Sequence, residues 1–209
     1  MKKAAEGARK RAKRLPPEER QKRLLANAIE AFARLGVGST VHADVAREAA
    51  VSVPTVFIYF PTREILITAV ISEVERFLLQ LMTETVIGKQ SIAAKVRAIL
   101  GAFARAVDEH PDYIKVWMDW STNVAEPTWS RYVAFQDRVL EGFEELIEEG
   151  KAAGEIHRSI DATMGAHLIM GSGHMIAQMK FRHRDDGMIE HFIETLIERA
   201  LFDSTASKR

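Results

Sequence analysis

The sequence predicts an all-α protein of about nine helices, because apolar residues recur in steps of three and four along most of its 209 residues. That spacing is typical of one face of a helix. Alternating runs of β-branched residues, which would indicate strands, are absent from the sequence. Gly occurs only 12 times and Pro only 6 times, so few helix breakers interrupt the pattern.

The composition is that of an ordinary folded protein, with 47% hydrophobic and 28% charged residues. There is no cysteine, which excludes disulfides and thiol chemistry. No apolar run approaches the ~18 residues that cross a bilayer, and the charged N-terminus lacks the apolar core of a secretory signal. We therefore expect a cytoplasmic protein with four segments: a basic arm (1–15), a small N-terminal domain (16–62), a larger helical domain (63–204) and a polar tail (205–209).

Charge is divided unevenly although the whole chain is neutral. Residues 1–63 contain 13 Lys and Arg against six Asp and Glu, a net charge of +7, and the remainder carries −7. Positive charge of this kind favours binding to a polyanion through its phosphates. In the arm, Arg9, Arg11 and Arg14 are expected to lie along phosphates or to enter a DNA minor groove. The alternative is a tail that only keeps the protein soluble.

The first helix is predicted to begin at Pro16 and Pro17 and to end at Gly36 and Gly38. Proline is tolerated in a first helical turn, and glycine readily adopts the left-handed backbone that ends a helix. The apolar stripe of this helix consists of Leu24, Leu25, Ala28, Ile29, Phe32 and Leu35.

Residues 42–60, HADVAREAAVSVPTVFIYF, read as two short helices that meet at a tight turn. We expect the first over 43–50 and the second over 53–59. Ser52 is predicted to cap the second helix by accepting hydrogen bonds from backbone N–H groups of its first turn. Pro54 then falls in that turn, where its missing N–H costs little.

In the second of these helices, Val56 and Phe60 are expected to face the core, which leaves other side chains pointing outward. Two short helices in this arrangement form a helix-turn-helix, whose second helix fits the major groove of DNA. An ordinary helical corner is the alternative. The outward side chains are Pro54, Thr55, Ile58 and Tyr59.

The rest of the chain predicts a larger helical domain. Thr62 is expected to cap a long helix that ends near Val86 and connects the two domains. Further helices are expected over stretches that open at Ile92, Pro111, Pro127, Asp161 and Asp185. Gly150 and Gly154 are expected to stop the helix that opens at Pro127. The glutamates on the outer face of that helix are most simply a solvated surface.

The last two predicted helices are apolar along more than one face. A terminal helix pair needs only one face buried within its own domain, so the second face indicates a partner helix pair and a dimer. A deeply buried core pair is the alternative. The residues expected at the interface are Met175, Met179, Ile189, Ile193 and Leu196. Three glycines would permit close helix approach there: Gly165, Gly171 and Gly173.

The segments HADVAREAAVSVPTVFIYFPTRE and KVWMDWS resemble the TetR family, and within it the HapR/SmcR-type quorum-sensing regulators. The resemblance implies a homodimeric transcription regulator that binds a near-palindromic stretch of double-stranded DNA. Thr55 and Tyr59 would contact phosphates, while Ser52, Thr55 and Ile58 would approach the bases. That subgroup has Asn where this chain has Ile58, so its preferred DNA sequence does not carry over.

The same subgroup has a ligand-sized pocket between its fourth, sixth, seventh and eighth helices. By position, the lining residues here would be Leu78, Leu79, Trp117, Gln136, Leu140 and Ile169. From the residues alone, an aromatic stripe that includes Trp117 is also typical of a core, and Gln136 could be a satisfied core amide. A ligand in such a pocket would be small and mainly apolar.

No catalytic or metal-binding constellation stands out in the sequence. There is no His-Glu-x-x-His motif and no nucleophile elbow, and His167 and His174 lie two helical turns apart, too far for one metal ion. We therefore expect neither an enzyme nor a bound cofactor. The second hypothesis is a helical small-molecule-binding or adaptor protein that does not bind DNA, and the basic N-terminal part argues against it.

Overall fold

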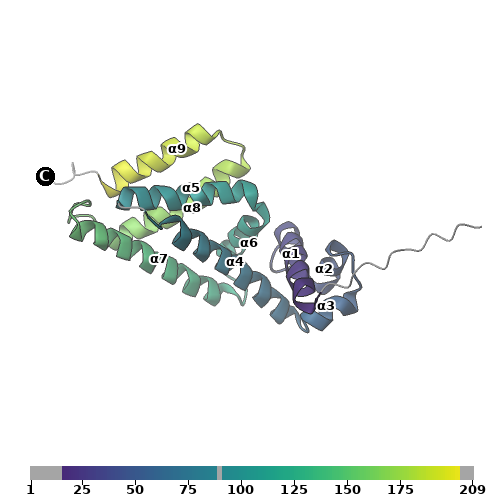
Figure 1. The fold of residues 1–209 in the computed structure, drawn as a ribbon. Helices are drawn as coiled ribbons and strands as arrows, with labels where there is room; N and C mark the ends of the chain where they lie inside the picture. The colour runs from purple at the N-terminus through teal and green to yellow at the C-terminus, as the bar shows by residue number, and fades with distance from the viewer. Residues whose placement is uncertain (1–15, 89–90, 203–209) are drawn as a thin grey trace, which may run out of the picture.

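The computed structural model describes residues 16–88 and 91–202, and these ranges contain helices and no strands (Figure 1). The predicted all-α class is confirmed. The helices are α1 (Pro17–Leu35), α2 (His42–Glu48), α3 (Val53–Tyr59), α4 (Arg63–Thr85), α5 (Ile92–Glu109), α6 (Pro111–Thr122), α7 (Trp129–Ala152), α8 (Ala162–Phe181) and α9 (Asp186–Thr195), followed by a π-helical turn (Leu196–Leu201).

The molecule is elongated, with α1, α2 and α3 at one end and α5 to α9 gathered into a larger bundle (Figure 1). Helix α4 runs from the small end into the bundle and so belongs to both. Thr62 caps α4 as expected, because its side chain accepts a hydrogen bond from the Ile65 N–H at 3.2 Å. None of the helices in the described ranges is long and apolar enough to cross a membrane.

The bounds of several helices differ from the sequence prediction. Helix α2 stops at Glu48 rather than at residue 50, and Ala50 adopts a left-handed backbone with φ of 51° in the turn before α3. Helix α7 begins at Trp129 and continues through Gly150. A Cβ on Gly150 would lie only 2.9 Å from the side chain of Ile92, so this glycine permits close packing instead of ending the helix. Gly154, with φ of 76°, follows the end of α7.

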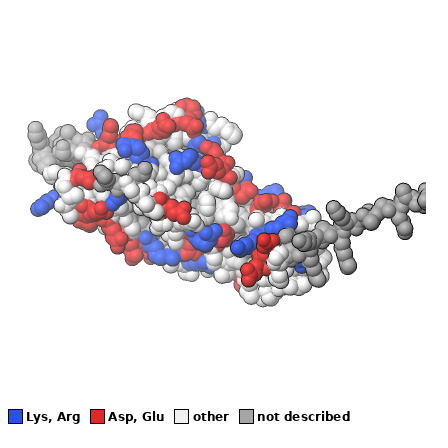
Figure 2. Space-filling model, viewed as in Figure 1, with Lys and Arg blue, Asp and Glu red and all other residues white. Residues whose placement is uncertain are grey.

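The outer face of α7 is acidic, as the sequence indicates. Figure 2 shows Asp and Glu side chains gathered over the part of this helix that lies farthest from α1 to α3. Glu148 pairs with Lys151 at 2.8 Å, and Glu149 pairs with Lys95 of α5 at 2.7 Å. These exposed pairs are typical of a solvated surface and each contributes little to stability.

The two ends of the molecule are joined through the loop between α1 and α2. Asp119 of α6 accepts a hydrogen bond from the Val37 backbone N–H, with 2.7 Å between nitrogen and Oδ2. Arg63, the first residue of α4, donates to the carbonyl oxygens of Val37, Gly38 and Thr40 at 2.9, 2.6 and 3.1 Å. The loop is therefore held from both the small domain and the bundle.

A group of ion pairs joins α4 to α7. Glu75 of α4 is almost fully buried, and its carboxylate pairs with Arg131 at 2.7 Å and also with Arg138. Burial lowers the pKa of Arg131 from its ordinary value, because the charged guanidinium loses solvation. A buried carboxylate requires such partners, so this triad fixes the relative position of the two longest helices.

Candidate nucleic-acid interface and internal cavity

Helix α3 presents a mostly apolar, uncharged face to solvent at one end of the molecule. Val56 is fully buried and Phe60 nearly so, as the sequence predicts, and both anchor the helix to the small domain. Ile58, on the opposite side, has 75% of its surface exposed. Pro54 and Ser52 are also exposed, whereas Thr55 and Tyr59 are partly buried.

The Ser52 side chain does not cap α3, which contradicts the sequence prediction. Its Oγ lies 2.8 Å from the Oγ1 of Thr55, and no backbone N–H of the first turn donates to it. The two hydroxyls satisfy each other, which competes with the capping bond. Ser52 remains at the N-cap position, and its backbone carbonyl accepts from the Thr55 N–H at 2.9 Å.

An aromatic stack between α2 and α3 was not predicted from the sequence. The rings of His42 and Phe57 lie parallel with centroids 4.0 Å apart. The Nε2 of His42 is also 2.7 Å from the Phe60 carbonyl oxygen, so the imidazole is fixed at both its face and its edge. The stack holds Phe57 in one position and fixes the angle between the two helices.

The predicted contacts of the basic arm, Arg9, Arg11 and Arg14, lie outside the described residues. Within the described part of the small domain, Arg34 and Arg47 are engaged in ion pairs with Glu48 and Asp44. The pKa of Asp44 is lowered, chiefly by the hydrogen bond that it accepts from the Val41 backbone N–H and further by Arg47.

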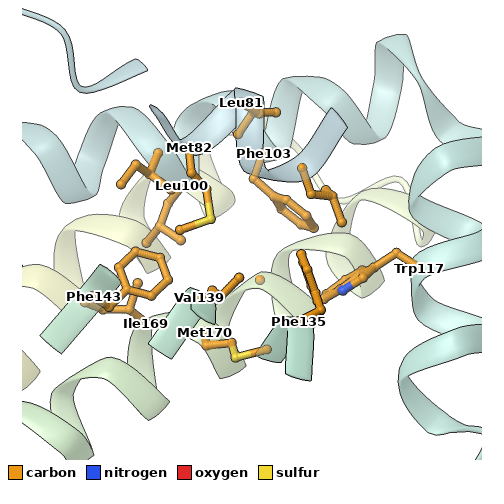
Figure 3. Close-up of a pocket in the computed structure, with 13 residues that line it drawn as sticks. Leu81, Met82, Leu100, Phe103, Trp117, Phe135, Val139, Phe143, Ile169 and Met170 are labelled. Carbon is orange, nitrogen blue, oxygen red and sulfur yellow. The ribbon is translucent and has the colours of Figure 1, made fainter. Parts of the chain in front are cut away.

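An apolar cavity of about 60 Å³ lies in the bundle between α4, α5, α6, α7 and α8 (Figure 3). Its wall consists almost entirely of carbon and sulfur atoms. Three of the six predicted lining residues are part of the wall: Leu78, Trp117 and Ile169. The other lining residues are Leu81, Met82, Ile99, Leu100, Phe103, Phe135, Val139, Phe143, Met170 and Gly173.

The predicted lining residues Leu79, Gln136 and Leu140 are not part of the wall, because each lies one position away from a residue that is. Successive helical residues are rotated by ~100°, so this offset turns a side chain away from the cavity. On α7 the wall is formed by Phe135, Val139 and Phe143, at steps of four. The four predicted helices all contribute to the wall, but α5 contributes as well through Ile99, Leu100 and Phe103, and the three side chains named above lie outside it.

The cavity is also smaller than the ligand-sized pocket expected from the resemblance, since pockets for drug-sized ligands start at ~300 Å³. Phe103 packs edge-on against Trp117, with ring centroids 5.4 Å apart, and both rings reduce the space. Met82 and Met170 have flexible side chains that can repack around a ligand. A ligand larger than the present space must displace some of these groups.

Two polar residues, His174 and Ser121, lie near Trp117 but are not part of the cavity wall. The ring of His174 lies 4.1 Å from that of Trp117, and its Nε2 is 2.9 Å from the Ser121 Oγ. Burial lowers the pKa of His174, so the imidazole is neutral at pH 7. His167 instead donates from Nδ1 to the Thr163 carbonyl at 2.8 Å. Both histidines thus have structural partners.

A stripe of exposed apolar side chains runs along the outer face of α8, and Met188 of α9 is exposed as well. The residues of the stripe are Met164, Leu168 and Met175. Gly171 lies among them, and a Cβ there would meet open space. Gly165 and Gly173 instead face their own chain, where they approach Ile147 and Phe103.

Two residues predicted at the dimer interface are turned into their own chain. Ile189 and Ile193 retain only 2% and 4% of their exposed surface, so neither can contact a partner. Met179 and Leu196 are partly buried, and Met175 is exposed. The side chains available to a second copy are therefore largely those of the α8 stripe.

Comparisons with known proteins are consistent with this architecture. The family model "Bacterial regulatory proteins, tetR family" matches residues 24–70, and the model "Tetracyclin repressor-like, C-terminal domain" matches residues 89–178. The HTH-type transcriptional regulator LuxR of Vibrio harveyi is 36% identical over 120 residues, which are 57% of this chain. The match spans 58% of the length of LuxR.

Solved structures share the fold over most of their length. A TetR-like transcriptional regulator from Rhodococcus sp. RHA1 aligns with a TM-score of 0.74 and 20% identity, over 89% of this chain and 97% of that one. The regulator FadR from Bacillus subtilis, solved in complex with stearoyl-CoA, aligns with a TM-score of 0.70 and 17% identity, over 84% and 97%. With both its N-terminal and its C-terminal domain matched, the chain belongs to the TetR family of bacterial regulatory proteins.

Proposed function

We propose that the protein is a homodimeric, sequence-specific transcription regulator that binds double-stranded DNA. The observation that carries this proposal is α3, an uncharged surface helix within the segment that matches the tetR N-terminal model. The net charge of +7 on residues 1–63 supports the same partner, since positive charge attracts phosphates. A regulator of this kind acts in the bacterial cytoplasm.

In this proposal α3 of each protomer enters a major groove. Thr55 and Tyr59 contact phosphates, while Ser52, Thr55 and Ile58 approach the base edges and Pro54 packs beside them. Two-fold symmetry of the dimer imposes a near-palindromic operator, with half-site centres separated by about one helical turn, roughly 34–36 Å, or somewhat more. The α8 stripe supplies the dimer contact.

Selection of bound sequences from a pool of random duplexes tests the proposed function. The full-length chain should enrich a near-palindrome and bind it with an affinity that falls steeply as salt rises, because bound phosphates release counterions. A protein that acts only as an adaptor or a small-molecule binder would enrich no sequence and would not shift duplex DNA at any salt concentration.

Deletion of residues 1–14 tests the role of the basic arm. It removes seven basic residues and one acidic residue, and it leaves α1 and the rest of the helical body whole. We expect weaker operator binding and a shallower slope of log K against log salt concentration, because fewer counterions are released on binding. Fluorescence anisotropy at several salt concentrations measures both quantities. An unchanged slope would show that the arm does not contact DNA.

The narrower proposal concerns what the regulator responds to. The two segments that resemble HapR/SmcR-type quorum-sensing regulators, together with the 36% identity to LuxR, support control of genes by cell density. Transcript profiles of a strain lacking the protein, compared with its parent at low and high cell density, test this role. A difference that is the same at both densities would contradict it.

The apolar cavity supports modulation by a small apolar ligand. Its wall offers no polar side chain besides the Trp117 indole, so binding would depend on apolar contacts and on shape. The Bacillus subtilis neighbour was solved in complex with stearoyl-CoA, which supports the idea that a protein of this fold can bind a ligand with a long apolar chain. Such a ligand would change DNA affinity only if it binds one arrangement of α4 and α6 more tightly than another. The change in DNA affinity cannot exceed the ratio of the ligand's affinities for the two arrangements.

Gly173→Ala tests whether the cavity takes up apolar molecules. The added methyl group would lie 3.9 Å from Phe103 and Trp117, an ordinary contact distance, and would occupy part of the cavity. We expect weaker uptake of xenon without loss of stability. NMR shifts of the Ile169 methyl groups measure the uptake. Alanine in place of a helical glycine stabilises by roughly 0.5–1 kcal/mol.

Gly142→Ala is the matched control, because Gly142 lies in helix α7 and a Cβ there would meet open space. It should give a similar gain in stability with unchanged xenon uptake. Equal xenon uptake by the Gly173→Ala variant and the wild type would contradict a role for this cavity. Trp117→Ala is a poorer test, because removal of a buried Trp costs about 3–5 kcal/mol and can unfold the bundle.

A further inference from the structure

The most prominent side chain of α3 is apolar. Ile58 has 75% of its surface exposed, and with 3.6 residues per turn it lies roughly opposite the buried Val56 and Phe60. Pro54 is one turn earlier on the same line of the helix and is exposed too. An isoleucine held this far into solvent contributes little to the core, and its burial against a partner would be favourable.

The polar groups of α3 are few and are already engaged or partly buried. Residues 53–59 include no charged side chain and no amide. The hydroxyls of Ser52 and Thr55 are 2.8 Å apart and bond to each other, and Tyr59 is partly buried. Bidentate hydrogen bonds to guanine or adenine require Arg, Lys, Asn or Gln, so this helix cannot make the usual contacts to purines.

Phe57 is the other large apolar side chain beside Ile58, but its ring is stacked on His42 at 4.0 Å and is held in place. Ile58 has no such partner in the described part of the chain. Val53, at the start of α3, is 36% exposed, so Ile58 is the most exposed apolar side chain of the helix and the one that reaches farthest toward a base edge. In the major groove the only apolar group on a base edge is the 5-methyl group of thymine.

We propose that Ile58 is a specificity-determining residue that contacts the 5-methyl group of a thymine in each half-site of the operator. This inference rests on the proposed function, since it assigns a base to the recognition helix. It also means that selectivity at this base pair depends on a methyl group and not on a hydrogen-bonding pattern.

The methyl group gives the expected size of the effect. Burial of one methylene-sized group favours binding by about fourfold, so uracil in place of the contacted thymine should weaken binding about fourfold in one half-site and about fifteenfold in both. Cytosine at that position should bind weakly, and 5-methylcytosine should recover part of the loss, because it restores the methyl group on a different base.

The experiment uses the full-length chain and starts with selection from random duplexes. The selected duplex is then synthesised with thymine, uracil, cytosine or 5-methylcytosine at each thymine in turn, and the affinity of each is measured. Wild type is compared with Ile58→Ala and Ile58→Asn. The control is Ile87→Ala, because Ile87 is 76% exposed but lies just beyond the far end of α4.

A thymine whose methyl group strengthens binding by wild type and by Ile87→Ala, but not by Ile58→Ala, supports the proposal. Ile58→Asn should then prefer a different base at that position, with an unchanged melting temperature because the site is exposed. If uracil binds as well as thymine everywhere, or if Ile58→Ala keeps the methyl preference, the proposal is overturned while DNA binding stands. If no sequence is enriched at all, the proposed function fails and the inference fails with it.

Discussion

Met175→Glu is expected to convert the dimer into monomers and to remove tight operator binding. Met175 is 48% exposed and lies on the α8 stripe with Met164 and Leu168, next to the open surface over Gly171. In a symmetric dimer the substitution buries two carboxylates in an apolar contact, which costs several kcal/mol for each unpaired charge. A monomer reaches only one half-site and loses the avidity of the pair, which is worth roughly 10²–10⁴ in affinity.

Sedimentation and fluorescence anisotropy measure these two effects on the same samples. Val124→Glu is the matched control, because Val124 is 63% exposed but lies between α6 and α7, away from the stripe. It should remain dimeric and bind DNA normally. A monomeric wild type, or a dimeric Met175→Glu variant, would contradict the proposed interface. A charge at Ile193 would not test it, since that side chain is buried in its own chain.

The sequence specifies the small domain well because its signals are local. Pro54 and the apolar positions around it determine α3 over Val53–Tyr59, the range that the sequence predicts. The inward side chains Val56 and Phe60 follow from the same spacing. Local signals of this type come from neighbouring residues, so no knowledge of the rest of the fold is needed.

The orientation of α9 could not be predicted for a physical reason. Ile189 and Ile193 occupy one apolar face and Met188 another, and periodicity alone does not say which face turns inward. In the structure the branched isoleucines pack inside while the flexible methionine is exposed. The choice depends on the shape of the surface on α5 that α9 covers, which is a property of the folded bundle.

The cavity and the hydrogen bonds between distant segments could not be predicted from local sequence patterns either. A void of about 60 Å³ is what remains when five helices pack imperfectly, so it depends on every side chain in its wall. The bond between Ser121 and His174 joins residues 53 positions apart, and the bond between Val37 and Asp119 spans 82 positions. No pattern in either segment indicates its partner.

Asp119→Ala is expected to loosen the junction between the small domain and the bundle. The Asp119 carboxylate accepts from the Val37 N–H at 2.7 Å, and its loss leaves a part-buried donor unsatisfied, which costs about 1–3 kcal/mol. The three hydrogen bonds from Arg63 remain, so the loop between α1 and α2 stays attached to α4. Its hydrogen bond to α6 is lost. We expect a lower free energy of unfolding and faster hydrogen exchange at the Val37 amide.

The same variant should also weaken any response of DNA binding to a ligand. Trp117 in the cavity wall and Asp119 at the junction lie two positions apart on α6, so a ligand that shifts this helix moves both. Asp119→Asn keeps an acceptor oxygen and should retain most of the bond and of the response. Asp137→Ala, at an exposed site on α7, should change neither stability nor response. Amide exchange at Val37 that is as slow in Asp119→Ala as in wild type would show that this hydrogen bond does not hold the junction. Any influence of α6 on the DNA-binding helices would then depend on the packing of α6 against α1.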